Sequence, residues 1–107
     1  MIEINEGILN VVVNEKRIEG SNHIFEHLVE ESKISDKDKV KKIIFDFANV
    51  EYINSLGIAE FISIIRYYTN VTNAVAKYKF INVNKDIRKL FSLVELGHLV
   101  EISESSG

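Results

Sequence analysis

The chain has 107 residues, of which 46% are hydrophobic, and a formal net charge of −3. A domain of this length buries roughly two thirds of the surface that its unfolded chain exposes, so a core is attainable without cross-links. The mildly acidic balance and the absence of cysteine exclude a basic nucleic-acid-binding surface, disulfides and thiolate metal sites.

The length and the lack of a linker or repeat predict a single domain, residues 1–107, and the absence of cysteine favours the cytoplasm. The stretch MIEINEG lacks the basic and apolar regions of a secretion signal, and no apolar run approaches the roughly 20 residues that span a bilayer. Ile2–Ile4 and Ile8–Val13 are β-branched runs on either side of Asn5-Glu6-Gly7, and they predict a hairpin. Helical spacing then predicts an amphipathic helix over about His23–Ser32.

The rest of the chain alternates between strand and helix patterns. Ile43–Phe47 is almost continuously apolar, which is typical of a parallel strand buried on both faces. A helix is predicted over Ser55–Thr69, and its core stripe consists of Ile58, Phe61, Ile62, Ile65 and Tyr68. It is followed by a predicted strand over Val75–Val83, a helix over Asp86–Val94 and a strand over Leu99–Ile102. The order β-β-α-β-α-β-α-β indicates an α/β fold with a mixed, mostly parallel sheet, and residues 103–107 are expected to form a flexible tail.

An elbow, NVEYINSLGIAE at residues 49–60, joins the apolar strand to the following helix. Such elbows expose side chains to partners. A helical wheel places Leu56 and Glu60 opposite the core stripe. Ser55 or Asn54 could cap the helix, which stabilises it by roughly 1 kcal/mol. A phosphate on Ser55 would meet free N–H groups and the positive end of the helix dipole, so the fold would tolerate this modification.

The stretch IIFDFANVEYINSLGIAEFISIIRYY resembles STAS domains of the anti-sigma factor antagonist type, in which an apolar strand, Asp and a Val-x-Tyr-Ile loop precede a Ser and a Gly that open a helix. KFINVNKDIRKLFSLVELGHLVEI is similar to the second half of the same family. The resemblance implies a phosphorylation switch at Ser55 and partner-binding residues Glu19, Asn54, Ser55, Leu56, Gly57 and Glu60. Asn54 stands where the family commonly has Asp, and we expect no counterpart of the further C-terminal helix of many members after Ile102.

The resemblance implies a partner-switching regulatory phosphoprotein. Unphosphorylated, it binds an anti-sigma factor of the ATP-binding serine-kinase type; phosphorylation of Ser55 releases it, and a phosphoserine phosphatase restores binding. The alternative is a constitutive STAS accessory subunit of a larger assembly, such as a lipid or anion transporter, in which Ser55 is only a cap.

A third hypothesis is a metal hydrolase, because HIFEH at residues 23–27 fits the H-x-x-E-H spacing of inverted zinc-peptidase sites. So short a pattern has a high false-positive risk, and His23 and His27 lie on the predicted solvent face, so a solvated helix face is favoured. Asp46 is expected to accept hydrogen bonds from backbone amides beside the elbow rather than to act in catalysis. We expect no catalytic residues, no metal and no cofactor.

Overall fold

The computed structural model describes residues 2–5, 7–20, 40–72, 76–93 and 100–104. Its elements, in chain order, are β1 (Ile2–Asn5), β2 (Ile8–Val12), β3 (Arg17–Ile18), β4 (Lys42–Asp46), β5 (Tyr52–Ile53), α2 (Ser55–Val71), β6 (Lys77–Val83), α3 (Lys85–Leu93) and β7 (Val100–Glu104). The helix predicted over His23–Ser32 lies outside the described residues, and with it the HIFEH motif.

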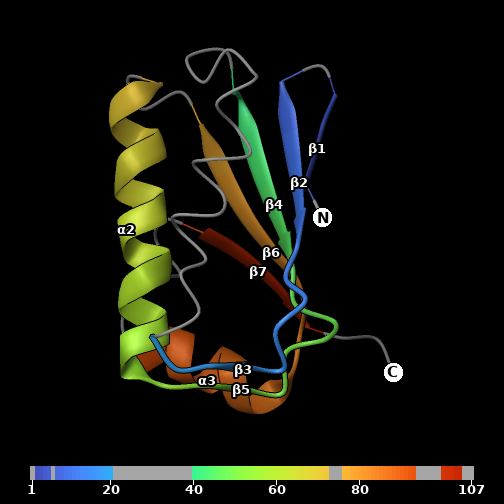
Figure 1. Cartoon of the computed structure of the whole chain (residues 1–107), viewed down its shortest axis with the longest axis vertical. Coiled ribbons are helices and arrows are strands. Elements are labelled where there is room, and N and C mark those ends of the chain that lie inside the picture. Colours follow the sequence, from blue (N-terminus) through green and yellow to red (C-terminus); the bar gives the residue numbers. More distant parts are fainter. Residues whose placement is uncertain (1, 6, 21–39, 73–75, 94–99, 105–107) are drawn as a thin grey trace.

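The main sheet has five strands in the order β1-β2-β4-β6-β7. β1 and β2 are antiparallel and form the predicted hairpin, whereas β2, β4, β6 and β7 pair in parallel. Gly7 lies at the hairpin turn with a φ of 82°, a conformation that glycine adopts without a steric penalty. The predicted α/β class with a mixed, mostly parallel sheet is therefore confirmed (Figure 1).

β3 and β5 form a separate two-stranded parallel sheet beside the start of α2 (Figure 1). Arg17 pairs with Tyr52, and Ile18 pairs with Ile53. These two strands were not predicted, because a two-residue strand is too short to show an alternating pattern. They matter because they hold the elbow against the segment that follows β2.

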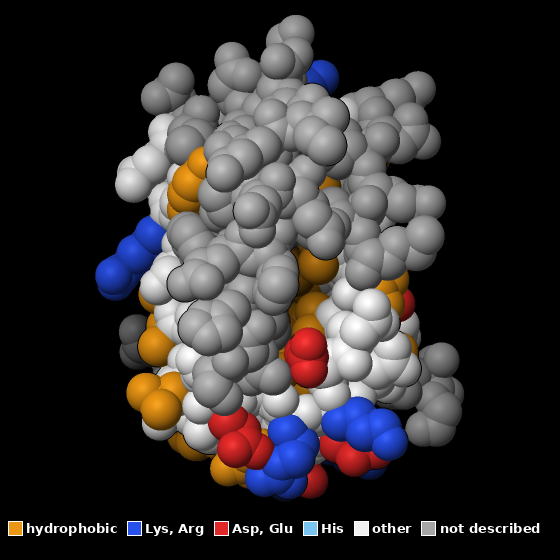
Figure 2. All heavy atoms as spheres, viewed as in Figure 1, with side chains coloured by type: hydrophobic (Ala, Val, Ile, Leu, Met, Phe, Trp, Pro, Cys, Tyr) orange, Lys and Arg blue, Asp and Glu red, His pale blue; other side chains and the backbone are white. Residues whose placement is uncertain are grey.

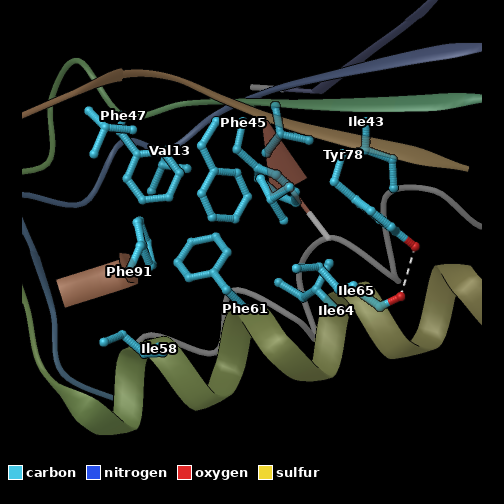
Figure 3. Close-up of a cluster of buried hydrophobic side chains, with 14 of the residues drawn as sticks. Val13, Ile43, Phe45, Phe47, Ile58, Phe61, Ile64, Ile65, Tyr78 and Phe91 are labelled. Carbon is cyan, nitrogen blue, oxygen red and sulfur yellow. Dashed lines mark hydrogen bonds between the residues drawn. The ribbon is translucent and has the colours of Figure 1, made fainter. Parts of the chain in front are cut away.

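The core lies between α2 and one face of the main sheet (Figure 3). In β4, Ile43 and Phe45 are buried, whereas Ile44 is only half-buried. The prediction that both faces of this strand are buried is wrong, because α2 packs only on the face that carries Ile43 and Phe45. Five phenylalanines interlock at the centre, with neighbouring ring centroids 5.0 to 5.8 Å apart: Phe45, Phe47, Phe61, Phe80 and Phe91.

α2 buries the predicted stripe and extends two residues beyond the predicted end, to Val71. Of the stripe, Ile62 is partly buried, and Ile64 is an additional buried residue. Tyr78 of β6 links the sheet to this helix: its hydroxyl donates to the carbonyl oxygen of Ile65 at 2.8 Å (Figure 3). Because that bond uses the only phenolic hydrogen, the 2.8 Å contact with Thr69 Oγ1 is one in which Thr69 donates.

The C-terminal elements differ from the prediction at their ends. β6 begins at Lys77, so Ala76 is not part of the strand, contrary to the prediction, and α3 begins at Lys85, one residue earlier than predicted. β7 continues to Glu104, so residues 103 and 104 belong to a strand and not to the predicted tail. Pairing with β6, including Val83 with Glu104, holds this end of the strand in the sheet.

Candidate functional site

The first turn of α2 follows β5 directly, and Asn54 caps it. Asn54 has an extended backbone, and its Oδ1 accepts a hydrogen bond from the N–H of Gly57 at 2.9 Å. Its carbonyl oxygen accepts from the N–H of Ile58 at 3.0 Å. The two capping alternatives are thus resolved in favour of Asn54. Ser55 is the first helical residue, and its side chain is exposed rather than used as the cap.

Asn54 also ties the helix to the end of β3. Its backbone N–H donates to the carbonyl oxygen of Ile18 at 3.0 Å, and its side-chain Nδ2 donates to the carbonyl oxygen of Glu19 at 3.3 Å. An aspartate would keep the acceptor for Gly57 but would have no hydrogen to donate to Glu19. The bond to Glu19 therefore gives a physical reason for asparagine at a position where the family that the sequence resembles commonly has aspartate.

Two glycines allow the β3 segment to approach the first turn closely. A Cβ on Gly57 would lie 2.6 Å from the carbonyl oxygen of Ile18 and 2.8 Å from Ile53 Cγ1. Gly20 has a φ of +95°, and a Cβ there would lie 2.6 Å from Leu56 Cβ. Gly57 is therefore buried as a packing residue and offers no surface to a partner. Gly20 was not singled out from the sequence, where nothing links it to the elbow.

The exposed part of the elbow combines apolar, aromatic and charged groups. Leu56 is 64% exposed and Tyr52 is 41% exposed. The guanidinium of Arg17 lies 4.3 Å from the centroid of the Tyr52 ring and forms an ion pair with Glu19. We call these four residues together with Ser55 the elbow surface. Figure 2 shows acidic and basic side chains gathered at this end of the molecule, next to apolar ones at the start of α2.

Of the residues predicted to bind a partner, Glu19, Asn54, Ser55 and Leu56 lie together at the elbow, and Glu60 follows as a half-buried residue on the next turn. Arg17 and Tyr52 were missed. Their stacking depends on the parallel pairing of β3 with β5, which joins segments about 35 residues apart. In the sequence, Arg17 and Tyr52 lie in two separate polar segments, and no pattern within either segment indicates that the two pair.

The helix N-terminus at Ser55 is electrostatically open to an anion. The first turn of α2 contains no acidic residue. Asn54 Oδ1 satisfies the N–H of Gly57, while the N–H groups of Ser55 and Leu56 have no partner among the described residues. Free N–H groups and the helix dipole together favour negative charge at this place. An added phosphate on Ser55 would therefore be compatible with the fold.

Asp46 has the structural role expected for it. Its Oδ1 accepts from the backbone N–H of Ala48 at 2.9 Å and from Asn82 Nδ2 at 3.0 Å. Asn82 has a φ of 57°, so the bond fixes an uncommon left-handed backbone next to the end of β4. Asp46 thus orders the loop that leads to the elbow.

Two other kinds of site have no support in the part of the chain that the structure describes. There, no three or more His, Cys, Asp or Glu side chains are grouped so that they could hold a metal ion. Nor does any helix in the same ranges have both the length and the apolar character needed to cross a membrane.

Solved structures with the same fold include both regulators and a transporter. A protein of Thermotoga maritima described as a candidate anti-sigma factor antagonist is 14% identical, with a TM-score of 0.68 over 99% of this chain and 86% of its own. The Bacillus cell-fate determinant SpoIIAA, solved in its phosphorylated form, is 17% identical, with a TM-score of 0.66 over 95% of this chain and 88% of its own. The murine anion transporter Slc26a9 is 15% identical, with a TM-score of 0.75 over 96% of this chain but only 17% of its own.

At these identities the likeness establishes the fold alone. No curated protein matches the sequence. The model of one family, described as the STAS domain, matches residues 2–107. Because that match spans all but the first residue, the chain belongs to the STAS domain family.

Proposed function

We propose that the protein is an anti-sigma factor antagonist that works by partner switching. Its unphosphorylated elbow surface binds an anti-sigma factor of the ATP-binding serine-kinase type. Phosphorylation of Ser55 by that partner releases it, and a phosphoserine phosphatase restores binding. The observation that carries the proposal is the position of Ser55, which is exposed at the first residue of α2 while Asn54 serves as the cap. Two regulators with the same fold, one of them solved in a phosphorylated form, support it.

The switch acts through charge rather than through a change of shape. Asn54, Gly57 and Gly20 fix the elbow by contacts that do not involve the Ser55 side chain. A phosphate adds about −1.5 to −2 of charge beside the exposed Leu56. A partner that packs on Leu56 must then desolvate or repel this charge, and loss of one well-packed anchor costs roughly 2 kcal/mol or more. That corresponds to about a thirtyfold loss of affinity.

In this scheme the chain is a ligand and a kinase substrate rather than a catalyst. It works in the cytoplasm, where the kinase and ATP are available. Arg17, Glu19 and Tyr52 extend the contact beyond Ser55, since they are exposed at the same elbow. They supply the charged and aromatic groups that make an interface selective.

A second candidate function is a constitutive accessory subunit of a larger assembly, such as a lipid or anion transporter. The observation that favours it is the similarity of this fold to one part of the anion transporter Slc26a9. In that case binding would not depend on the state of Ser55.

Affinity capture from native lysate separates the two functions. Wild type and Ser55→Ala should retain the same kinase-type partner, whereas Ser55→Asp should retain it at least about tenfold less well. Ser63→Asp is the matched control, because it places the same charge at another exposed serine of α2, away from the elbow. Adding ATP should release wild type but not Ser55→Ala. Equal capture of all four proteins, with Ser55 unmodified in phosphopeptide maps, would replace the switch by the constitutive subunit.

A further inference from the structure

The outer face of α3 forms a cationic hollow that the proposed switch does not use. Ile87 and Phe91 are buried against the core. On the opposite side of the helix, Lys85, Arg88, Lys89 and Ser92 line a surface hollow of about 320 Å³. This volume is at the lower end of the range of roughly 300 to 1,000 Å³ that small-molecule sites occupy. The helix α3 lies at the same end of the molecule as β3 and β5 (Figure 1).

The charges of this face are arranged unfavourably for the isolated helix. Lys85 and Lys89 are one turn apart, and like charges at this spacing repel each other. Lys85 is also the first helical residue, where the helix dipole disfavours a cation, whereas Asp86 in the same turn is an acid that the dipole favours. Neither lysine forms an ion pair with a described residue, although the chain as a whole has a net charge of −3. A bound anion would relieve the repulsion between the two lysines.

Hydrogen bonds anchor the helix that lines the hollow. Asn84 caps α3 by accepting from the N–H of Ile87 at 2.9 Å. Its Nδ2 donates to the carbonyl oxygens of Val50 at 3.3 Å and Glu51 at 3.4 Å, in the loop before β5. Ser92 Oγ donates to the carbonyl oxygen of Lys89 at 2.7 Å, which fixes a hydroxyl on the lining. The cations therefore project from a helix whose start and lining are anchored.

We propose that this hollow binds a phosphate-bearing anion with at least two negative charges, held by Lys85, Arg88 and Lys89. A phosphate presents several acceptor oxygens at once, which suits clustered lysine and arginine donors. A soluble phosphate compound and the headgroup of an anionic lipid share this chemistry. The site is separate from Ser55, so neither proposal depends on the other.

A titration with sodium pyrophosphate at constant ionic strength, followed by backbone amide NMR, tests the site. We expect saturable shifts confined to the amides of residues 85–92. The double variant Lys85→Gln/Lys89→Gln should bind about tenfold less tightly or worse, since each cation contributes its own Coulomb attraction. The matched control is Lys41→Gln/Lys77→Gln, which removes the same charge from two exposed lysines at the amino ends of β4 and β6. It should bind like wild type, and so should Ser55→Asp.

Cosedimentation with phosphatidylcholine vesicles, with and without phosphatidylglycerol, identifies the source of the anion. Binding that requires phosphatidylglycerol and both lysines identifies a lipid headgroup. Pyrophosphate binding without vesicle binding identifies a soluble phosphate compound. The proposal is overturned if neither probe binds saturably, or if Lys85→Gln/Lys89→Gln binds as tightly as the control variant.

Discussion

Asn54 connects the helix, β3 and the elbow through one short side chain, and its two hydrogen bonds can be separated by substitution. Asn54→Ala removes both the cap and the bond to Glu19, so we expect a loss of about 1–2 kcal/mol in the free energy of unfolding. Asn54→Asp keeps an acceptor for Gly57 and gains from the helix dipole, but it loses the donor to Glu19. It should therefore stay within about 1 kcal/mol of wild type. Urea melts measure both values, and equal large losses would contradict the assignment of the cap.

Gly57 tests whether close packing or helix propensity dominates at the elbow. A glycine-to-alanine change inside a helix ordinarily stabilises by about 1 kcal/mol. Here the new Cβ would lie 2.6 Å from the Ile18 carbonyl oxygen, and a backbone atom cannot move aside as a flexible side chain can. Overpacking of this kind costs typically 1–3 kcal/mol, so we expect Gly57→Ala to destabilise the protein.

The control for this substitution is Ala59→Gly, two residues further along and exposed. It should cost about 1 kcal/mol through helix propensity alone. A Gly57→Ala variant that melts above wild type would show that β3 does not press against the first turn.

The sequence predicted those residues of the site that follow from a local pattern. Helical periodicity correctly predicted that Leu56 lies on the exposed face of the helix. The position of Asp46 at the end of an apolar strand correctly predicted that its carboxylate accepts a backbone hydrogen bond in the loop. The positions of Gly20, Arg17 and Tyr52 depend on contacts between the segments at residues 17–20 and 52–57. No periodicity within either segment reports a contact with the other, so these residues could not be found from the sequence.

At the scale of elements, β4 is the clearest test of which sheet face is covered. Ile43 is fully buried, whereas Ile44 is half-buried on the opposite face. Ile43→Ala should cost about 2–5 kcal/mol because it leaves a cavity against α2. Ile44→Ala should cost about 1 kcal/mol, the usual effect of a single substitution outside a packed core. Equal losses in urea melts would mean that the second face is also covered.

The prediction for this strand was wrong because a continuous apolar run contains no alternation from which to choose a face. The choice depends on where the helices pack, which is a property of the whole sheet. Longer elements were predicted well, because α2 and α3 have enough turns for helical periodicity to identify their buried faces. Their observed ends differ from the predicted ends by only one or two residues.

The link between β6 and α2 should respond to pH. Burial raises the pKa of the Tyr78 hydroxyl above its ordinary value of 10.0, the nearby Tyr68 raises it further, and the hydrogen bond from Thr69 lowers it. The net pKa is higher in the folded than in the unfolded protein. The stability that this group contributes is therefore fully present below about pH 10 and is lost as pH rises through the folded pKa.

Tyr78→Phe separates this contribution from the titration of the other tyrosines. It removes the bonds to Ile65 and Thr69, so we expect about 1 kcal/mol less stability at neutral pH. Above about pH 10 its stability should decline less steeply than that of wild type. Urea melts over a pH series measure the two slopes, and parallel curves would rule out Tyr78 as the titrating group.

At the scale of the whole molecule, modification of Ser55 should change binding and leave folding intact. The Ser55 side chain is exposed and takes no part in the contacts that fix the elbow. We therefore expect Ser55→Asp to have the circular dichroism spectrum and thermal midpoint of wild type. The purified kinase-type partner should raise the midpoint of wild type but not that of Ser55→Asp. A lowered midpoint of the free variant would show that the side chain supports the fold.

The elbow surface has a further consequence for the lifetime of the protein. Its residues come from segments about 35 positions apart, so the surface exists only in the folded chain. A partner that binds it at a concentration a hundredfold above its Kd stabilises the folded state by about 2.7 kcal/mol. In the proposed switch, release on phosphorylation would withdraw that stabilisation and raise the unfolded fraction about a hundredfold. Since proteases act on transiently unfolded chains, the kinase that ends the interaction would also shorten the survival of the released protein.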